Sequence, residues 1–229
     1  MPIEVKICGL TDEAAVAAVV AARADYAGFV FFPPSPRHVA PDRAARLAQP
    51  LRGRVVTVAL TVDADDQTFD DIFDKLGPDL LQLHGSESPE RVAGLKARYR
   101  VPVMKMVPIR ELADLAGVEP YLGIADRILF DAKVPASASR PGGLGIRFDW
   151  HILAGRSLDL PVMLSGGLDA DAVGEAIAIA GPDAVDVSSG VESAPGKKDP
   201  KAIAGFAAAV RAADASKVGS HPNLERSVS

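Results

Sequence analysis

The sequence holds a single cysteine, Cys8, few aromatic residues and no long apolar run. One cysteine cannot form an internal disulfide, which favours a reducing compartment. No apolar stretch approaches the length needed to span a bilayer. The first predicted strand begins almost at the N-terminus, so we expect no secretory leader. Together these absences predict a cytoplasmic protein with no membrane partner.

Other absences exclude whole classes of function. The net charge of −5 is spread along the chain, and lysine and arginine form no dense cluster, which argues against a nucleic-acid partner. No H-x-x-H, H-E-x-x-H or C-x-x-C spacing occurs, so we expect no metal site. The G-x-S-x-G of α/β hydrolases is also missing.

What the chain does contain is a regular alternation of strand-like and helix-like segments. Nearly half of its 229 residues are hydrophobic, enough for a substantial core. The predicted strands are 4–9, 26–32, 54–62, 79–84, 101–108, 127–131, 161–165 and 184–188. Such an α/β pattern predicts a single-domain (β/α)8 barrel over residues 1–214 and a disordered tail over 215–229. The structural alternative, an open doubly wound sheet, would show G-x-G-x-x-G after its first strand if it bound a dinucleotide, and that fingerprint is absent.

Helices are expected between these strands. Thr11 is the predicted cap of a helix over 12–24, and Ser88-Pro89 opens another with a capping serine and a proline at its first position. Further helical segments are expected over 41–49, 68–75, 111–122 and 148–154. Asp169 is the predicted cap of the next helix, and the last one should run from Asp199-Pro200 to about residue 213.

Polar residues gather where the predicted strands end. In a barrel these positions form one mouth, whereas a purely structural core would carry valine, isoleucine or leucine there. The candidates are Lys6, Cys8, Arg37, His38, Gln82, His84, Lys105, Asp131, Asp186 and Ser188. Each has a structural alternative: Cys8 as a buried thiol, Arg37 as a surface ion pair, His84 as a donor to a loop. So many polar groups at strand ends favour a small-molecule active site.

Two glycine clusters follow the last two strands. They are Ser165-Gly166-Gly167 and Ser188-Ser189-Gly190. Glycines can serve only to let the chain turn. Barrels, however, frequently bind phosphate in the loops after strands seven and eight, with backbone N–H groups as donors. We therefore expect a phosphate site formed by Gly166, Gly167, Ser188, Ser189 and Gly190.

Several short motifs, in order and in register over about residues 3–212, resemble one family. They are Lys6-Ile7-Cys8-Gly9, Ser35-Pro36-Arg37, Gln82-Leu83-His84-Gly85, Leu129-Phe130-Asp131, Gly142-Gly143, Ser165-Gly166-Gly167 and Asp186-Val187-Ser188-Ser189-Gly190-Val191-Glu192, followed by Lys198-Asp199. The chain resembles the phosphoribosylanthranilate isomerases of tryptophan biosynthesis. It departs from the family pattern in its third strand and in an alanine- and serine-rich loop over 132–145, which we expect to be mobile and to close over the substrate.

The resemblance implies an Amadori rearrangement of N-(5-phosphoribosyl)anthranilate that needs no cofactor. It implies Cys8 as the general base and Asp131 as the general acid. Arg37 would bind the anthranilate carboxylate, while Gln82, His84 and Asp186 would contact the substrate. Gly143 would join the two glycine clusters at the phosphate. The resemblance leaves the oligomeric state, monomer or homodimer, open.

The chemistry fits these residue types. Ring opening needs a protonated acid, and an apolar setting from Ile128, Leu129 and Phe130 would favour the protonated form of Asp131. Removing the C2′ proton needs a thiolate, which the nearby Lys6 would favour at Cys8.

Three alternative functions would leave different marks on the sequence. The histidine-pathway isomerase typically has aspartate in place of Cys8 and a second phosphate site. Indole-glycerol-phosphate synthase would have a longer N-terminus and a glutamate–lysine catalytic set. A non-catalytic phosphosugar-binding barrel would not need both Cys8 and Asp131.

Overall fold

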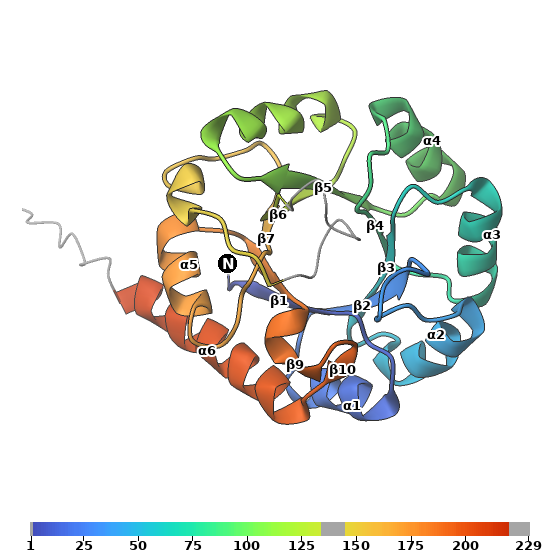
Figure 1. The fold of residues 1–229 in the computed structure, drawn as a ribbon, viewed down its shortest axis with the longest axis horizontal. Coiled ribbons are helices and arrows are strands. Elements are labelled where there is room, and N and C mark those ends of the chain that lie inside the picture. The colour runs from blue at the N-terminus through green and yellow to red at the C-terminus, as the bar shows by residue number, and fades with distance from the viewer. Residues whose placement is uncertain (1, 134–144, 220–229) are drawn as a thin grey trace, which may run out of the picture.

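Eight parallel strands form a closed barrel surrounded by helices. The computed structural model describes residues 2–133 and 145–219. The strands are β1 (Glu4–Cys8), β2 (Tyr26–Phe31), β3 (Val56–Thr61), β4 (Leu80–Leu83), β5 (Val103–Ile109), β6 (Arg127–Ala132), β7 (Val162–Leu164) and β8 (Ala184–Val187). They lie in sequence order, and β1 pairs with β8 to close the ring (Figure 1). The predicted (β/α)8 barrel is confirmed, and the open sheet is excluded.

Helices follow the strands and form the outer ring in Figure 1. They are α1 (Glu13–Ala21), α2 (Pro41–Ala48), α3 (Asp66–Lys75), α4 (Pro89–Tyr99), α5 (Val173–Ala180) and α6 (Pro200–Gly219), with the 3-10 helices η1 (Gln49–Leu51), η2 (Leu112–Tyr121), η3 (Trp150–Leu153) and η4 (Ser189–Val191). Ser88 caps α4 as predicted, accepting a hydrogen bond from the N–H of Arg91. No helix within the described ranges is long and apolar enough to cross a membrane.

Several predicted helix details are wrong. Asp12, not Thr11, caps α1, because the Asp12 carboxylate accepts the N–H of Ala15 while the Thr11 hydroxyl donates to the carbonyl of Gly196. Asp169 holds a turn that precedes α5 rather than capping the helix itself. The helical segment predicted over 111–122 is present, as the 3-10 helix η2, and its Pro120 lacks an amide donor.

The C-terminal helix is longer than predicted. It continues to Gly219, so residues 215–219, which were assigned to a disordered tail, are helical. Residues 220–229 and most of the loop over 132–145 lie outside the described residues. The loop after β8 also contains a small hairpin that the sequence did not predict, formed by β9 (Glu192–Ala194) and β10 (Lys197–Lys198).

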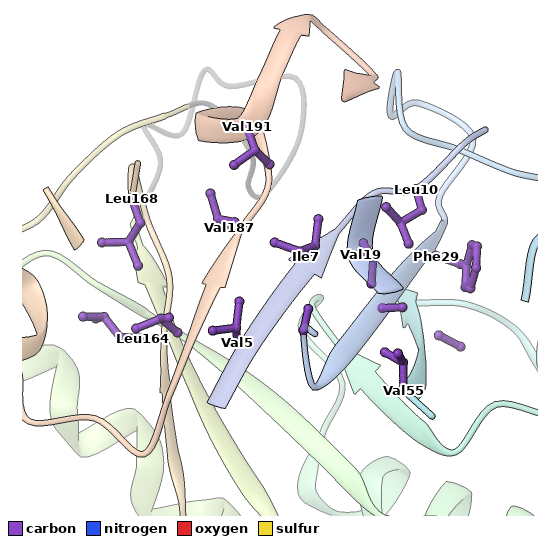
Figure 2. Close-up of a cluster of buried hydrophobic side chains, with 14 of the residues drawn as sticks. Val5, Ile7, Leu10, Val19, Phe29, Val55, Leu164, Leu168, Val187 and Val191 are labelled. Carbon is purple, nitrogen blue, oxygen red and sulfur yellow. The ribbon is translucent and has the colours of Figure 1, made fainter. Parts of the chain in front are cut away.

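The core lies in two layers, because successive strand residues point to opposite faces. The outer faces of the strands share one large apolar cluster with helix residues such as Val19 of α1, and Figure 2 shows Val5 and Ile7 of β1 and Val187 of β8 within it. A second apolar cluster fills the inside of the barrel. It consists of Tyr26, Val58, Leu80, Met104, Met106, Leu129, Met163 and Ala184. These residues fix which positions of each strand face inward.

Candidate active site

The inward-facing positions at the carboxyl ends of the strands carry most of the predicted polar residues. Alternation from the inner cluster places Asp131 two residues after Leu129, and Asp186 two residues after Ala184, inside the barrel. Lys6 contacts Asp186 and is therefore also inside, as is Cys8 two residues later. Gln82 and His84 follow Leu80 in the same way. All six are buried.

The Cys8 thiol sits at the end of β1 in a tight enclosure. A Cβ atom on the neighbouring Gly28 would lie 3.0 Å from its Sγ, so a larger residue at position 28 would press against the sulfur. Burial raises the pKa of Cys8 above its ordinary value, while Lys6 opposes this rise. The sequence correctly anticipated the influence of Lys6, but burial is the larger effect. Val30 and Leu60 pack beside Cys8 and form an apolar wall.

Asp131 lies at the end of β6 with both carboxylate oxygens in defined contacts. Its Oδ1 accepts the N–H of Ala132 at 2.8 Å, and its Oδ2 lies 3.4 Å from Nε2 of His84. The other ring nitrogen of His84, Nδ1, lies 3.0 Å from the amide nitrogen of Gln82. A Cβ atom on Gly166 would lie 3.1 Å from Asp131 Oδ1, so this glycine allows the loop after β7 to approach the carboxylate.

The expected apolar surroundings of Asp131 are only partly present. Ile128 and Phe130 belong to the outer layer of the core, on the opposite face of β6, and only Leu129 shares the inner face with Asp131. The expectation treated three consecutive residues as neighbours, whereas alternation along the strand separates them. The immediate partner of the carboxylate is His84 instead.

A buried ion pair joins the neighbouring strands β1 and β8 inside the barrel. Lys6 Nζ donates to Asp186 Oδ1 at 2.9 Å, and the lysine side chain has no exposed surface. The Ser165 hydroxyl donates to Asp186 Oδ2 at 3.3 Å. Burial by itself lowers the pKa of Lys6, but Asp186 and Cys8 together outweigh it, and the pKa is raised above its ordinary value. Two partners, Lys6 and Ser165, therefore orient the Asp186 carboxyl group.

Replacing Lys6 by methionine should destabilise the fold strongly. The change leaves the Asp186 carboxylate buried without its cation, which typically costs about 3–5 kcal/mol. Urea unfolding followed by circular dichroism measures the loss in free energy of unfolding. Lys75→Met is the matched control, because Lys75 pairs with Asp74 at the exposed surface and should show little change. A loss at Lys6 no larger than the control's would contradict a structural role for the pair.

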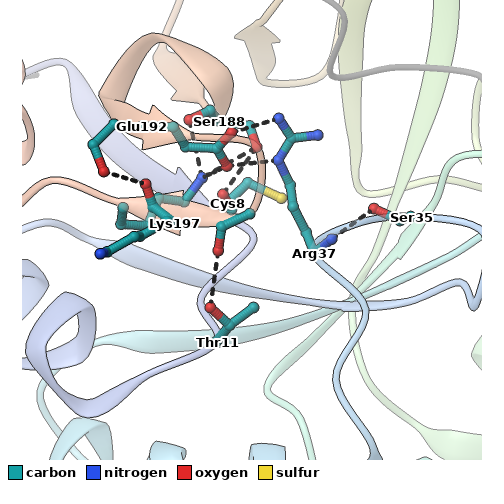
Figure 3. A network of polar contacts seen from close by, with 10 residues as sticks. Cys8, Thr11, Ser35, Arg37, Ser188, Glu192 and Lys197 are labelled. Atoms are coloured by element: carbon teal, nitrogen blue, oxygen red, sulfur yellow. Dashed lines mark hydrogen bonds and ion pairs between the residues drawn. The ribbon is translucent and has the colours of Figure 1, made fainter.

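Arg37 enters the mouth from the loop after β2 and meets the β9–β10 hairpin. Its Nε and Nη2 donate to Oε1 and Oε2 of Glu192 at 2.7 and 2.8 Å (Figure 3). Lys198 Nζ donates to the same Oε1 at 2.8 Å and to the carbonyl of Ser188 at 2.9 Å. The Ser188 hydroxyl in turn donates to the carbonyl of Cys8 at 3.1 Å. This buried network connects the loops after β1, β2 and β8.

The two predicted glycine clusters lie against each other. A Cβ atom on Gly190 would fall 1.9 Å from the carbonyl oxygen of Leu168, so the loops after β7 and β8 touch at a point where only glycine fits. Gly167, with a φ of +63°, also lies against another loop, since a Cβ atom on it would fall 2.8 Å from the carbonyl oxygen of Gly145. Gly145 also lies near the Ser189 hydroxyl. Three loops thus converge on one small region, while Gly143 lies outside the described residues.

Two of the strand-end candidates do not belong to the site. Lys105 alternates with the inward-facing Met104 and Met106, so it points outward, where its Nζ donates to Glu87 Oε2 at 2.8 Å. His38 is exposed after the loop that carries Arg37. Conversely, sequence reasoning assigned no role to Glu192 and Lys198, although both stand in motifs that carried the family resemblance.

The described part of the chain offers no metal site, since no cluster of histidine, cysteine, aspartate or glutamate there could hold an ion. What the mouth offers instead is a thiol, a carboxyl group with a histidine beside it, an arginine and a glycine-lined region. Such groups suit proton transfer on a small anionic molecule.

Comparisons with known proteins agree with this chemistry. The family model described as N-(5'phosphoribosyl)anthranilate (PRA) isomerase matches residues 5–209. The N-(5'-phosphoribosyl)anthranilate isomerase of Mesorhizobium japonicum is 54% identical over 213 residues, covering 93% of this chain and 97% of that protein. The phosphoribosyl anthranilate isomerase structure from Thermotoga maritima is 33% identical with a TM-score of 0.82, over 92% of this chain and 99% of that one.

A further solved structure carries a ligand. It is a phosphoribosyl anthranilate isomerase in complex with reduced 1-(o-carboxyphenylamino)-1-deoxyribulose 5-phosphate, and it is 32% identical to this chain with a TM-score of 0.79, over 92% of this chain and 99% of that one. The match runs through the barrel from β1 to α6, including the strand ends where the thiol, the carboxyl group and the glycine loops lie. The chain therefore belongs to the N-(5'-phosphoribosyl)anthranilate isomerase family.

Proposed function

We propose that this protein converts N-(5-phosphoribosyl)anthranilate to 1-(2-carboxyphenylamino)-1-deoxyribulose 5-phosphate, with Asp131 as general acid and Cys8 as general base. The observation that carries the proposal is that both groups face the barrel interior at the carboxyl ends of β6 and β1, within one mouth. Proton transfer at two points of a sugar needs two such groups. The reaction is a step of tryptophan biosynthesis, and the single cysteine is consistent with the cytoplasm as its location.

The rearrangement proceeds in three steps. Asp131 gives its proton to the ring oxygen of the ribose as the C1′–O bond breaks and the anilino nitrogen forms a C1′=N bond. The Cys8 thiolate then removes the C2′ proton, and the C–H electrons form a C1′=C2′ double bond while the nitrogen becomes neutral. The resulting enaminol gains a proton at C1′ and loses one from the 2′-hydroxyl, which leaves the ketone. No electrons are gained or lost overall.

The remaining side chains would hold the substrate. The Arg37 guanidinium suits the anthranilate carboxylate, and the apolar wall of Val30 and Leu60 beside Cys8 suits its ring. The buried oxygen of the Gln82 side chain, Oε1, has no hydrogen-bond partner among the described residues and could accept one from a sugar hydroxyl. His84 and Asp186 would complete the sugar contacts.

The phosphate would lie where the loops after β7 and β8 converge, at Gly166, Gly167, Ser188, Ser189 and Gly190. Backbone N–H groups in such loops are the usual donors to a phosphate in barrels of this kind. Gly143 is proposed for the same role on its motif alone.

The proposed activity predicts turnover by the purified protein without added metal or nucleotide. Conversion of phosphoribosylanthranilate is followed by chromatography of substrate and product, in the presence of a chelator. In cells, the gene should restore growth to a tryptophan auxotroph that lacks this isomerase, and not to a histidine auxotroph that lacks the corresponding histidine-pathway isomerase. Rescue of the histidine auxotroph alone would assign the chain to the other Amadori isomerase. Sedimentation of the same preparation distinguishes monomer from homodimer.

A further inference from the structure

Glu192 holds the Arg37 side chain by two hydrogen bonds and uses both of its carboxylate oxygens to do so. We propose that Glu192 is a positioning residue, which fixes the Arg37 guanidinium so that its free edge meets the substrate carboxylate and the enzyme selects carboxylated substrates. The proposal rests on the function proposed above, in which Arg37 binds that carboxylate. It assigns to Glu192 a part in substrate selection that is separate from the acid and the base.

The geometry of the pair leaves one side of the guanidinium available. Glu192 accepts hydrogen bonds from Nε and Nη2 of Arg37. The third nitrogen, Nη1, points away from Glu192 (Figure 3) and has no partner among the described residues. A guanidinium can donate to two carboxylates at different edges, because its five N–H donors lie in one plane. With the Nε edge occupied, an incoming carboxylate is directed to the Nη1 side. The two side chains are 5% and 4% exposed, so neither can rotate freely into solvent.

The path of the Arg37 side chain also depends on its surroundings. Its Cδ lies 2.6 Å from the position that a Cβ on Gly9 would occupy, and Gly9 has a φ of +85°. Arginine therefore crosses directly over the turn that follows Cys8. A long side chain placed this way loses much of its rotamer freedom before the substrate arrives, which strengthens binding by reducing the entropy lost at that moment.

The hairpin that carries Glu192 is itself braced against neighbouring loops. The carbonyl of Gly196 accepts the Thr11 hydroxyl at 3.0 Å, and a Cβ on Gly196 would fall 2.3 Å from the carbonyl oxygen of Pro36. Lys198 on the returning strand ties the hairpin to Ser188. The hairpin that carries Glu192 is thus held in place by contacts with the loops after β1, β2 and β8.

The charges match a ligand with one carboxylate. Burial alone would raise the pKa of Glu192, but Arg37 and Lys198 together hold it below its ordinary value, so the side chain is ionised. Arg37 and Lys198 share this one carboxylate, and burial lowers the pKa of Lys198 below its ordinary value. A second carboxylate, supplied by the substrate, would find an arginine that is not fully neutralised and is already oriented.

The test compares two ligands on the same protein. One is reduced 1-(o-carboxyphenylamino)-1-deoxyribulose 5-phosphate, and the other is the same compound without the carboxyl group. Isothermal titration of wild-type protein should give tighter binding of the first, and Arg37→Ala should remove that preference. Glu192→Gln should reduce the preference about tenfold, through weaker binding of the carboxylated ligand, and leave the affinity for the other ligand unchanged. Adding Glu192→Gln to Arg37→Ala should have no further effect on the preference.

Glu13→Gln is the matched control and should leave both affinities unchanged, because Glu13 also accepts two hydrogen bonds from one arginine, Nη1 and Nη2 of Arg43, but at the exposed surface. If Glu192 has only a structural role, Glu192→Gln should lower the affinity for both ligands equally, and this result would overturn the inference. An unchanged preference for the carboxylated ligand would overturn it as well. If wild-type protein shows no preference, the proposed role of Arg37 fails instead. Should Glu192→Gln not fold, Glu192→Asp keeps the charge but is one methylene shorter, and it should lower the same preference.

Discussion

Replacing Cys8 by alanine should lower kcat by about two to four orders of magnitude, the usual contribution of a positioned general base. The substitution removes the group that takes the C2′ proton and leaves no other thiol in the chain. Binding of the reduced product analogue should change little, because the thiol acts on the reacting carbon in the transition state. Steady-state kinetics with titration of the analogue measures both quantities. Normal turnover by Cys8→Ala would remove Cys8 from the mechanism.

The pH dependence gives a second test of the same residue. The base form is the thiolate, and burial raises the pKa of Cys8, so kcat/KM should rise with pH through the neutral range into the alkaline range. Cys8→Asp supplies a base whose ordinary pKa is about 3.9. This variant should keep part of the activity and lose the rise with pH in that range. An identical pH profile in both proteins would show that another group causes the rise.

The fold was predictable because its signals are local. Short apolar runs that end in polar or glycine residues gave all eight strands to within a few residues, as for β1 and β8. The direction of the side chains was harder to predict. Strands buried on both faces read as continuous apolar runs, so nothing in the sequence distinguishes the inner from the outer positions. Lys105 was therefore placed at the mouth, although it points outward to Glu87.

The electrostatic support of the site could not be predicted for a different reason. Glu192 and Arg37 are 155 positions apart, and their contact depends on a hairpin of very short polar strands. Neither apolar periodicity nor a turn motif marks such strands. The contact of His84 with Asp131 was not predictable either, because it joins the ends of β4 and β6, which are separated by β5 in the barrel. The sequence therefore predicted which residues reach the mouth better than which residues hold them in place.

Asp131→Asn should also lower kcat by about two to four orders of magnitude. Asparagine has nearly the same shape, and its side-chain oxygen can still accept the N–H of Ala132, so the local structure should be retained. It cannot give a proton to the ring oxygen, which stops the reaction before Cys8 has a C2′ proton to remove. The affinity for the reduced product analogue should remain close to that of wild type, since this ligand is already open. Kinetics and titration on one preparation measure the two effects.

The chain contains its own control for this change. Asp149 contacts the ring of His151 at 2.8 Å, so it forms a second aspartate–histidine pair, which is exposed to solvent. Asp149→Asn should leave kcat and ligand affinity unchanged, because this pair lies at the start of η3 and not in the barrel mouth. Comparable kcat values for Asp131→Asn and Asp149→Asn would contradict the acid role. A deep loss confined to Asp131→Asn, with analogue binding intact, would place the missing proton at the ring-opening step, because only that step needs an acid at the ring oxygen.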